Sequence, residues 1–203
     1  MFARIAPVHP GRVLALVPAS RYIGHAVLDC TGLAPASFAT WNLEPNRPYE
    51  DRLRLFLLCL HHSLRVHRPA VLVLGVPRFD DDRLRVFRRI AAKLATAHGV
   101  SVVARRVDDA RRLLFGRTRG DRLDALADRL VRGFFPQLAV PRTTGEARRY
   151  HRNAFSAAAV ALHELVERAP LSAAVIAKNE AFAMGRFNAA LAESARRHFP
   201  DNL

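Results

Sequence analysis

The chain has 203 residues, half of them hydrophobic and a quarter charged, which is the size and composition of one globular domain or a domain with an appendage. These values exclude a disordered chain and a collagen, and two cysteines exclude a disulfide scaffold. The 32 basic and 18 acidic residues give a net charge of +14, and all but two of the basic residues are arginines. Codon bias explains arginine in place of lysine but not the excess, which favours a polyanionic partner, with DNA or RNA the first candidate.

The first half of the chain alternates between extended and helical patterns. Short apolar runs predict strands at 12–17, 22–29, 36–43 and 70–76, and the first three are close enough in sequence to form an antiparallel meander. Leu53, Phe56, Leu57, Leu60 and Leu64 recur at helical spacing and predict a helix over 49–67. The acidic start at Asp80 predicts a second helix over 80–98.

The second half is mostly helical and basic. A fifth strand is predicted at 100–104, and helices at 108–115, 121–134, 146–168 and within 172–199. The order predicts an α/β protein with a mixed sheet, on which the helices pack. The chain has no apolar run of the roughly 20 residues needed to cross a bilayer and no signal-peptide core, so we expect a cytoplasmic protein without membrane contact.

Four local strings resemble the RuvC-like Holliday-junction resolvases, in the same order and at similar spacing. They are LALVPASRYIGHAVLD at 14–29, RPAVLVLGVPRF at 68–79, the basic segment 100–135, and NAFSAAAVALHEL at 153–165. The resemblance implies a ribonuclease H-like fold: a mixed five-stranded sheet flanked by helices. It covers a domain of residues 12–168, and residues 169–203 then form a helical C-terminal extension.

The resemblance also implies a catalytic site, and this chain departs from it. The family's chemistry uses four carboxylates to hold two Mg²⁺ ions about 4 Å apart. The positions that match those carboxylates are Val17, Gly75, Asn153 and Ser156. None of these side chains carries a charge, so we expect no catalytic residue, no metal and no cofactor at this site. A displaced acidic cluster at Asp80–Asp82 is the alternative, although their place at a helix start is a sufficient structural reason for these aspartates.

The basic positions of the family are retained. Its lysines near the cut site match Arg111 and Arg122, and an aromatic residue that stacks on junction bases matches Phe79 with a shift of one residue. Phe79 serves equally well as a hydrophobic staple of the following helix. The predicted nucleic-acid-binding residues are Arg21, Arg78, Phe79, Arg105, Arg106, Arg111, Arg112, Arg117, Arg119 and Arg122. Within 105–122 only Asp108, Asp109 and Asp121 oppose seven arginines, although a solvated basic face is the simpler explanation of such a run.

Partners beyond nucleic acid stay open. Family members are homodimers, which implies a dimer helix near 80–98. Arginines at 83, 85, 88 and 89 make that helix more charged than a self-complementary interface usually is. A stripe of Phe187, Leu191 and Ala195 in the extension is explained by a packed core or by a protein partner.

The leading hypothesis is a non-catalytic, RuvC-like protein that binds structured or double-stranded nucleic acid, DNA in preference to RNA, through phosphates. The alternatives are a scaffold subunit of a larger nucleic-acid-associated complex and an active Mg²⁺-dependent nuclease with a relocated site. No element that reads bases is evident, so the sequence does not name the nucleic acid, its structure or a pathway.

Overall fold

The protein is described from a computed structural model, in which residues 9–19, 21–29, 35–44, 46–78, 81–115 and 146–168 are placed. The predicted helices at 121–134 and 172–199 and the C-terminal extension lie outside these residues. In the described part of the chain, no helix combines the length and the apolar character that a membrane span requires.

The sheet has five strands in the order β3-β2-β1-β4-β5. Strands β1 (His9–Pro18), β2 (Tyr22–Asp29) and β3 (Pro35–Asn42) form the predicted antiparallel meander. Strands β4 (Pro69–Val76) and β5 (Ser101–Arg106) extend it in parallel beyond β1. Because β1, β3 and β4 run in the same direction, Pro18, Asn42 and Val76 all end at one edge of the sheet, here called the C-terminal edge.

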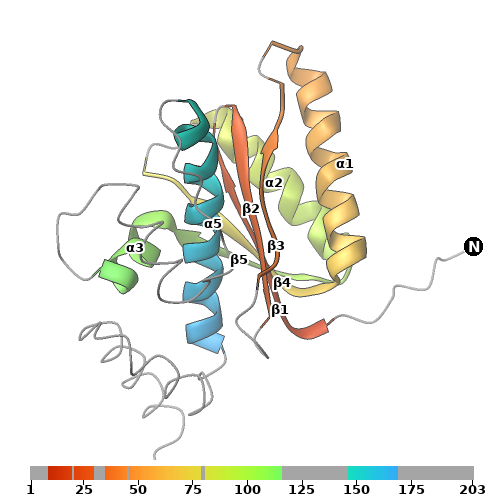
Figure 1. Cartoon of the computed structure of the whole chain (residues 1–203). Coiled ribbons are helices and arrows are strands. Elements are labelled where there is room, and N and C mark those ends of the chain that lie inside the picture. The colour runs from red at the N-terminus through yellow and green to blue at the C-terminus, as the bar shows by residue number, and fades with distance from the viewer. Residues whose placement is uncertain are drawn as a thin grey trace, which may run out of the picture.

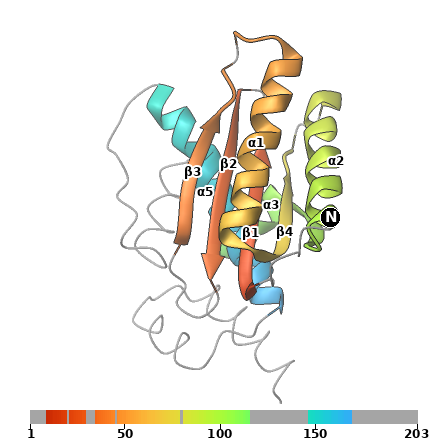
Figure 2. The same cartoon turned by 90° about the vertical axis from the view of Figure 1, so that its right-hand side faces the viewer.

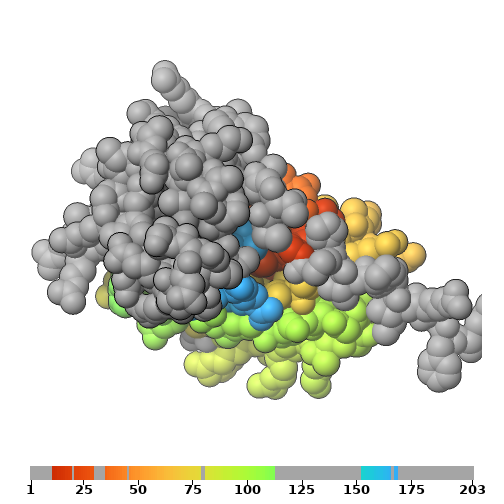
Figure 3. All heavy atoms as spheres, turned by 90° about the horizontal axis from the view of Figure 1, so that it is seen from below, coloured from red at the N-terminus to blue at the C-terminus, as the bar shows by residue number. Residues whose placement is uncertain are grey.

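Helices cover both faces of the sheet, as Figures 1 and 2 show. The helices α1 (Tyr49–His67) and α2 (Asp82–Ala97) lie on one face, and α3 (Val107–Phe115) and α5 (Glu146–Arg168) lie on the other. The view from below shows the end of α5, the first strands and α1 following one another across the molecule (Figure 3). Each face has its own apolar core, because β1 and β4 are buried on both sides.

The helix boundaries follow from local chemistry. Asp81 caps α2 by accepting a hydrogen bond from the Leu84 amide at 2.8 Å, and Asp82 pairs with Arg85 at 2.9 Å. The predicted start of this helix at Asp80 is therefore two residues early. Arg68 ends α1 in the left-handed region, with φ at 47°. Strand β5 continues two residues beyond the predicted 100–104, so Arg105 and Arg106 belong to the strand.

Helix α5 makes the closest contact with the sheet. Its residues 154–162 are all buried, and most of them are alanines, which allow a helix backbone to approach closely. Gly24 of β2 lies directly beneath the α5 backbone at Asn153. A Cβ at position 24 would collide with the backbone carbonyl of Asn153, so only glycine fits there. This contact between Gly24 and the α5 backbone fixes the depth of α5 on the sheet.

The face under α1 buries a histidine. His25 of β2 is 2% exposed, its Nε2 lies 2.7 Å from the Ser63 hydroxyl, and its ring stacks on Trp41 at 4.8 Å. Burial, with a smaller contribution from the neighbouring His67, lowers the pKa of His25 to about 3. The imidazole is therefore neutral at physiological pH.

Candidate functional site

The four positions that the resemblance aligns with the resolvase carboxylates, here called the matched positions, come from three elements and lie toward the C-terminal edge of the sheet. Val17 lies near the end of β1, Gly75 near the end of β4, and Asn153 and Ser156 one helical turn apart on α5. A pocket of about 380 Å³ opens there between α3 and α5. Its described lining is Val17, Pro18, Ala19, Pro77, Arg78, Val107, Asp108, Arg111, Arg152, Asn153 and Ser156.

Val17 and Gly75 fit into each other. A Cβ built on Gly75 would lie 2.5 Å from Cγ2 of Val17 and 3.4 Å from Cγ2 of Val107, and real Cβ atoms avoid the first of these distances. The Val17 side chain therefore fills the volume that a side chain at position 75 would need. At the floor of the pocket, two neighbouring strands contribute apolar packing and no polar side-chain atom.

The two matched positions on α5, Asn153 and Ser156, make long hydrogen bonds. The Asn153 amide nitrogen donates to the Tyr22 carbonyl at 3.5 Å, across the close contact between α5 and β2. Ser156 is 3% exposed, and the Arg111 guanidinium donates to its hydroxyl at 3.5 Å. Arg111, on α3, thus reaches across the pocket to one of the four matched positions.

The pocket is electropositive. Three guanidinium groups line it, those of Arg78, Arg111 and Arg152, and Asp108 is the one carboxylate among its described lining residues. Arg78 and Arg152 are exposed, whereas Arg111 and Asp108 are half-buried. In the described part of the chain, no three His, Cys, Asp or Glu residues group closely enough to hold a metal ion.

The other predicted arginines are distributed differently. Arg105 donates to the buried carboxylate of Glu164 at 2.8 Å, and Arg168 pairs with the same carboxylate. The expectation that only nearby aspartates oppose this arginine run was therefore wrong, because Glu164 is supplied by α5. Arg112 pairs with Asp109 at 3.0 Å, and Arg106 is exposed on β5.

Arg21 is exposed in the turn between β1 and β2, at the same edge of the sheet. Phe79, Arg117, Arg119 and Arg122 lie outside the described residues, so their place relative to the pocket stays a prediction.

Sequence reasoning missed Asp108, Arg152 and Glu164. On α5, Arg152 precedes Ser156 by four residues and Glu164 follows Ser156 by eight. Helical spacing therefore places Arg152, Ser156 and Glu164 on neighbouring parts of one face of α5. A charged residue inside the alanine-rich stretch 154–165 was the available signal for Glu164.

Part of the chain is similar in sequence to a known nuclease. The chain matches no protein-family model. Over 97 residues it is 33% identical to the crossover junction endodeoxyribonuclease RuvC of Alkalilimnicola ehrlichii. The aligned residues make up 46% of this chain and 54% of that protein. The match thus spans about half the length of this curated relative.

Solved structures share the fold over a greater length. The Thermus thermophilus RuvC structure aligns with a TM-score of 0.61 and 18% identity, over 79% of this chain and 97% of that one. The complex of T. thermophilus RuvC with a Holliday junction substrate aligns with a TM-score of 0.58 and 18% identity, over 79% of this chain and 96% of that one. The yeast mitochondrial Holliday junction resolvase Ydc2 aligns with a TM-score of 0.62 and 10% identity, over 96% of this chain and 87% of that one. The predicted ribonuclease H-like fold, with its mixed five-stranded sheet and flanking helices, is confirmed.

Proposed function

We propose that this chain is a RuvC-like protein that has lost the nuclease reaction and binds structured or double-stranded nucleic acid, DNA in preference to RNA, through backbone phosphates. The observation that carries the proposal is the pocket between α3 and α5. Its lining brings three of the matched positions, Val17, Asn153 and Ser156, together with three arginines. The fourth position, Gly75, packs against Val17.

A pair of Mg²⁺ ions does not fit the residues present. Mg²⁺ takes oxygen ligands in a strict octahedral arrangement, mainly carboxylates and water, and a two-metal site needs several carboxylates to offset four positive charges. Val17 and Gly75 offer no side-chain oxygen, while Asn153 and Ser156 offer neutral ones. Asp108 supplies one negative charge, which three guanidinium groups in the same lining outweigh. We therefore derive no metal-dependent step at this pocket.

The same residues suit a phosphodiester. Guanidinium groups donate paired hydrogen bonds to phosphate oxygens, and the Ser156 hydroxyl beside Arg111 adds a further donor. Loss of carboxylates removes the repulsion that a nucleic-acid backbone would otherwise meet there without metal ions. The RuvC complex with a Holliday junction substrate makes a four-way junction the first ligand to test.

The test uses a labelled four-way junction and a duplex of matched sequence. The purified protein is titrated into each at two salt concentrations, with and without Mg²⁺, and the products are run on native and denaturing gels. We expect complexes that weaken at the higher salt concentration and intact strands in every lane. The ratio of junction to duplex affinity measures how far binding depends on structure.

Two charge-reversal variants make this test specific to the pocket. Arg111→Glu combined with Arg152→Glu should abolish binding, as should Arg111→Glu combined with Arg122→Glu. The matched control is Arg65→Glu with Lys93→Glu, which makes the same change in net charge at exposed positions near the far ends of α1 and α2. This control should retain most of the affinity.

Three results would contradict the proposal. Mg²⁺-dependent cleavage would show that the protein is a nuclease, and its loss on changing Asp80–Asp82 to asparagine would place the reaction at the helix start. Equal loss of binding in the control would make the attraction a matter of net charge alone. Absence of binding, together with a protein partner that co-purifies after nuclease treatment, would favour the scaffold hypothesis.

A further inference from the structure

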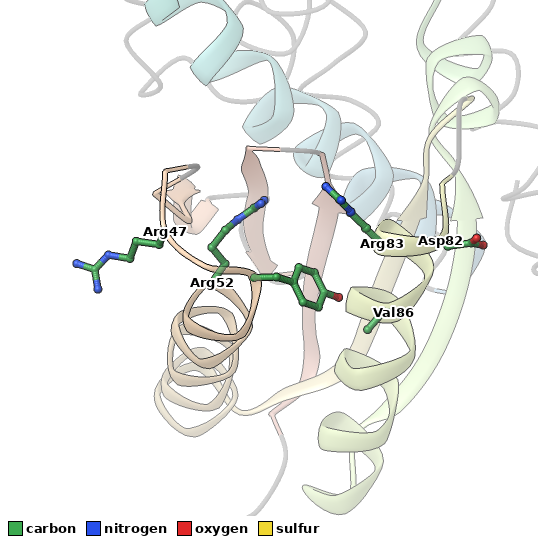
Figure 4. A pocket seen from close by; sticks show the side chains of 6 residues that line it. Arg47, Arg52, Asp82, Arg83 and Val86 are labelled. Carbon is green, nitrogen blue, oxygen red and sulfur yellow. The ribbon is translucent and has the colours of Figure 1, made fainter.

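A second basic cavity lies on the other face of the sheet. It has a volume of about 540 Å³ and lies between the first turns of α1 and α2 (Figure 4). Its described lining is Arg47, Tyr49, Arg52, Asp82, Arg83 and Val86. Since α1 follows the end of β3 and α2 follows the end of β4, this cavity is at the C-terminal edge, where the pocket between α3 and α5 also lies.

Two of its charged side chains point away from the opening. Asp82 is 93% exposed and pairs with Arg85 outside the cavity, and Arg47 pairs with Glu44 in the loop before α1. Figure 4 shows both side chains directed outward, whereas Arg52 of α1 and Arg83 of α2 extend toward the same opening from facing helices. The charged groups that extend into the opening are therefore two guanidinium groups, on separate rigid elements.

Aromatic packing between α1 and α2, below the cavity, fixes the position of one helix relative to the other. The Tyr49 ring contacts Phe87 edge-on at 6.0 Å, and Phe56 contacts Phe87 at 5.1 Å. Phe56 and Phe87 are almost fully buried in the core between the helices and the sheet. Arg52 and Arg83 thus project from a preformed frame, which lowers the entropy lost when both bind one ligand.

Two further exposed arginines lie at the same edge. Arg21 occupies the turn between β1 and β2, and Arg78 follows β4 by two residues and lines the first pocket. The C-terminal edge therefore carries guanidinium groups at both cavities: Arg78, Arg111 and Arg152 line the first pocket, and Arg52 and Arg83 line the second. A ligand that contacts both groups needs negative charge repeated along its length, which a nucleic-acid backbone provides.

We propose that the cavity between α1 and α2 binds a second phosphodiester segment of the same nucleic acid that occupies the pocket between α3 and α5. This inference rests on the proposed function, since it takes the ligand of the first pocket to be a nucleic acid. The bound backbone then crosses the edge of the sheet, with Arg52 and Arg83 as its outer contacts. Short ligands that fill only the first pocket gain nothing from the second.

The test compares ligand lengths in the full chain. Affinities for a short duplex, a duplex several times longer and a four-way junction are measured by fluorescence anisotropy over a series of salt concentrations. For Arg52→Glu with Arg83→Glu we expect at least about a tenfold loss of affinity for the long duplex or the junction, and little change for the short duplex. The slope of log K against log salt should fall by about 0.9 for each phosphate contact that is lost.

The controls separate this inference from the proposed function. Arg65→Glu with Lys93→Glu should behave as wild type, and Arg111→Glu with Arg152→Glu should lose binding of every ligand. If the cavity variant binds the long ligands as wild type while the pocket variant does not, the second site is overturned and the proposed function stands. If both variants bind as wild type, both proposals fail.

A folding check completes the design. Circular dichroism and urea unfolding are measured for each variant. Should the glutamate pair fail to fold, Arg52→Ala with Arg83→Ala removes the two charges without adding negative ones. This neutral variant should show the same length-dependent loss at smaller magnitude, and an unchanged salt slope for the long duplex would overturn the inference.

Discussion

At the scale of single residues, the most informative pair is Val17 and Gly75. One methyl group of Val17 occupies the place of a side chain at position 75, so neither residue can be understood alone. A glutamate introduced at position 75 meets Val17 before it reaches the pocket. Carboxylates can therefore be introduced at these two positions only together, and a single substitution is not expected to create a metal site.

This coupling predicts the outcome of a double-mutant cycle. Gly75→Ala should destabilise the protein by about 1–3 kcal/mol, because the new Cβ overpacks against Val17. In a Val17→Ala background the same substitution should cost close to nothing, which gives an interaction free energy of about 1 kcal/mol or more. Urea unfolding of the four proteins measures both quantities. Additive costs would mean that the two side chains do not compete for the same space.

At the scale of elements, a buried carboxylate joins β5 to α5. Glu164 is 1% exposed and accepts hydrogen bonds from Arg105 of β5 and Arg168 of α5. A buried carboxylate is stable only when cations compensate its lost hydration. Arg105 thus has a structural role that is sufficient to explain it, and its contribution to nucleic-acid binding stays a prediction.

Neighbouring arginines on β5 should therefore differ in effect. Arg105→Ala leaves the Glu164 carboxylate with Arg168 alone and should lower the free energy of unfolding by about 1–3 kcal/mol. Arg106→Ala removes an exposed side chain and should change it by less than about 0.5 kcal/mol. Denaturant unfolding of both variants is the measurement. Equal stabilities would refute the structural role of Arg105.

At the scale of the whole molecule, the protonation of four histidines makes the free energy of unfolding depend on pH. Burial is the first cause that lowers the pKa values of His25, His67, His98 and His163. Each of these histidines accepts a proton more readily in the unfolded chain than in the folded one. Their contributions act in the same direction, so the fold loses stability as the pH falls below about 6.5.

His25 should account for a measurable part of this loss. Between pH 6.5 and its folded-state pKa of about 3, the unfolded chain binds one proton at this position and the folded chain binds none. Stability then falls by up to about 1.4 kcal/mol for each pH unit in this window. Urea unfolding at pH 7, 6 and 5 should give a shallower pH dependence for His25→Gln than for wild type. Parallel curves would show that His25 is protonated in the fold.

Both proposed binding sites lie at one edge of the molecule. The two basic cavities are on opposite faces of the sheet, yet both adjoin the C-terminal edge, because β1, β3 and β4 end there and the connections to α1 and α2 start there. Ligands of α/β sheets commonly bind beyond the carboxyl ends of the strands. A basic edge of this kind suits an extended polyanion better than a small molecule.

Local signals carried most of the fold. Apolar runs and helical spacing predicted the bounds of β2, α1 and α5 to the residue, and the order of elements predicted the mixed sheet. These features depend on neighbours along the chain, and so they can be read from the sequence. The start of α2 differs by two residues because Asp81 caps the helix locally. Strand β5 reaches Arg106 because its last two residues pair with Gly75 and Val76 of β4, a contact between distant parts of the chain.

The sequence by itself determined that positions 17, 75, 153 and 156 carry no carboxylate and that seven arginines lie within 105–122, because residue identity needs no coordinates. Only the tertiary structure decided that Val17 fills the place of a side chain at Gly75 and that Glu164 neutralises Arg105. The same holds for Arg52 and Arg83, which share one cavity. Each of these relations joins residues far apart in the chain, and the free energy of such contacts depends on distance in space, which chain spacing does not encode.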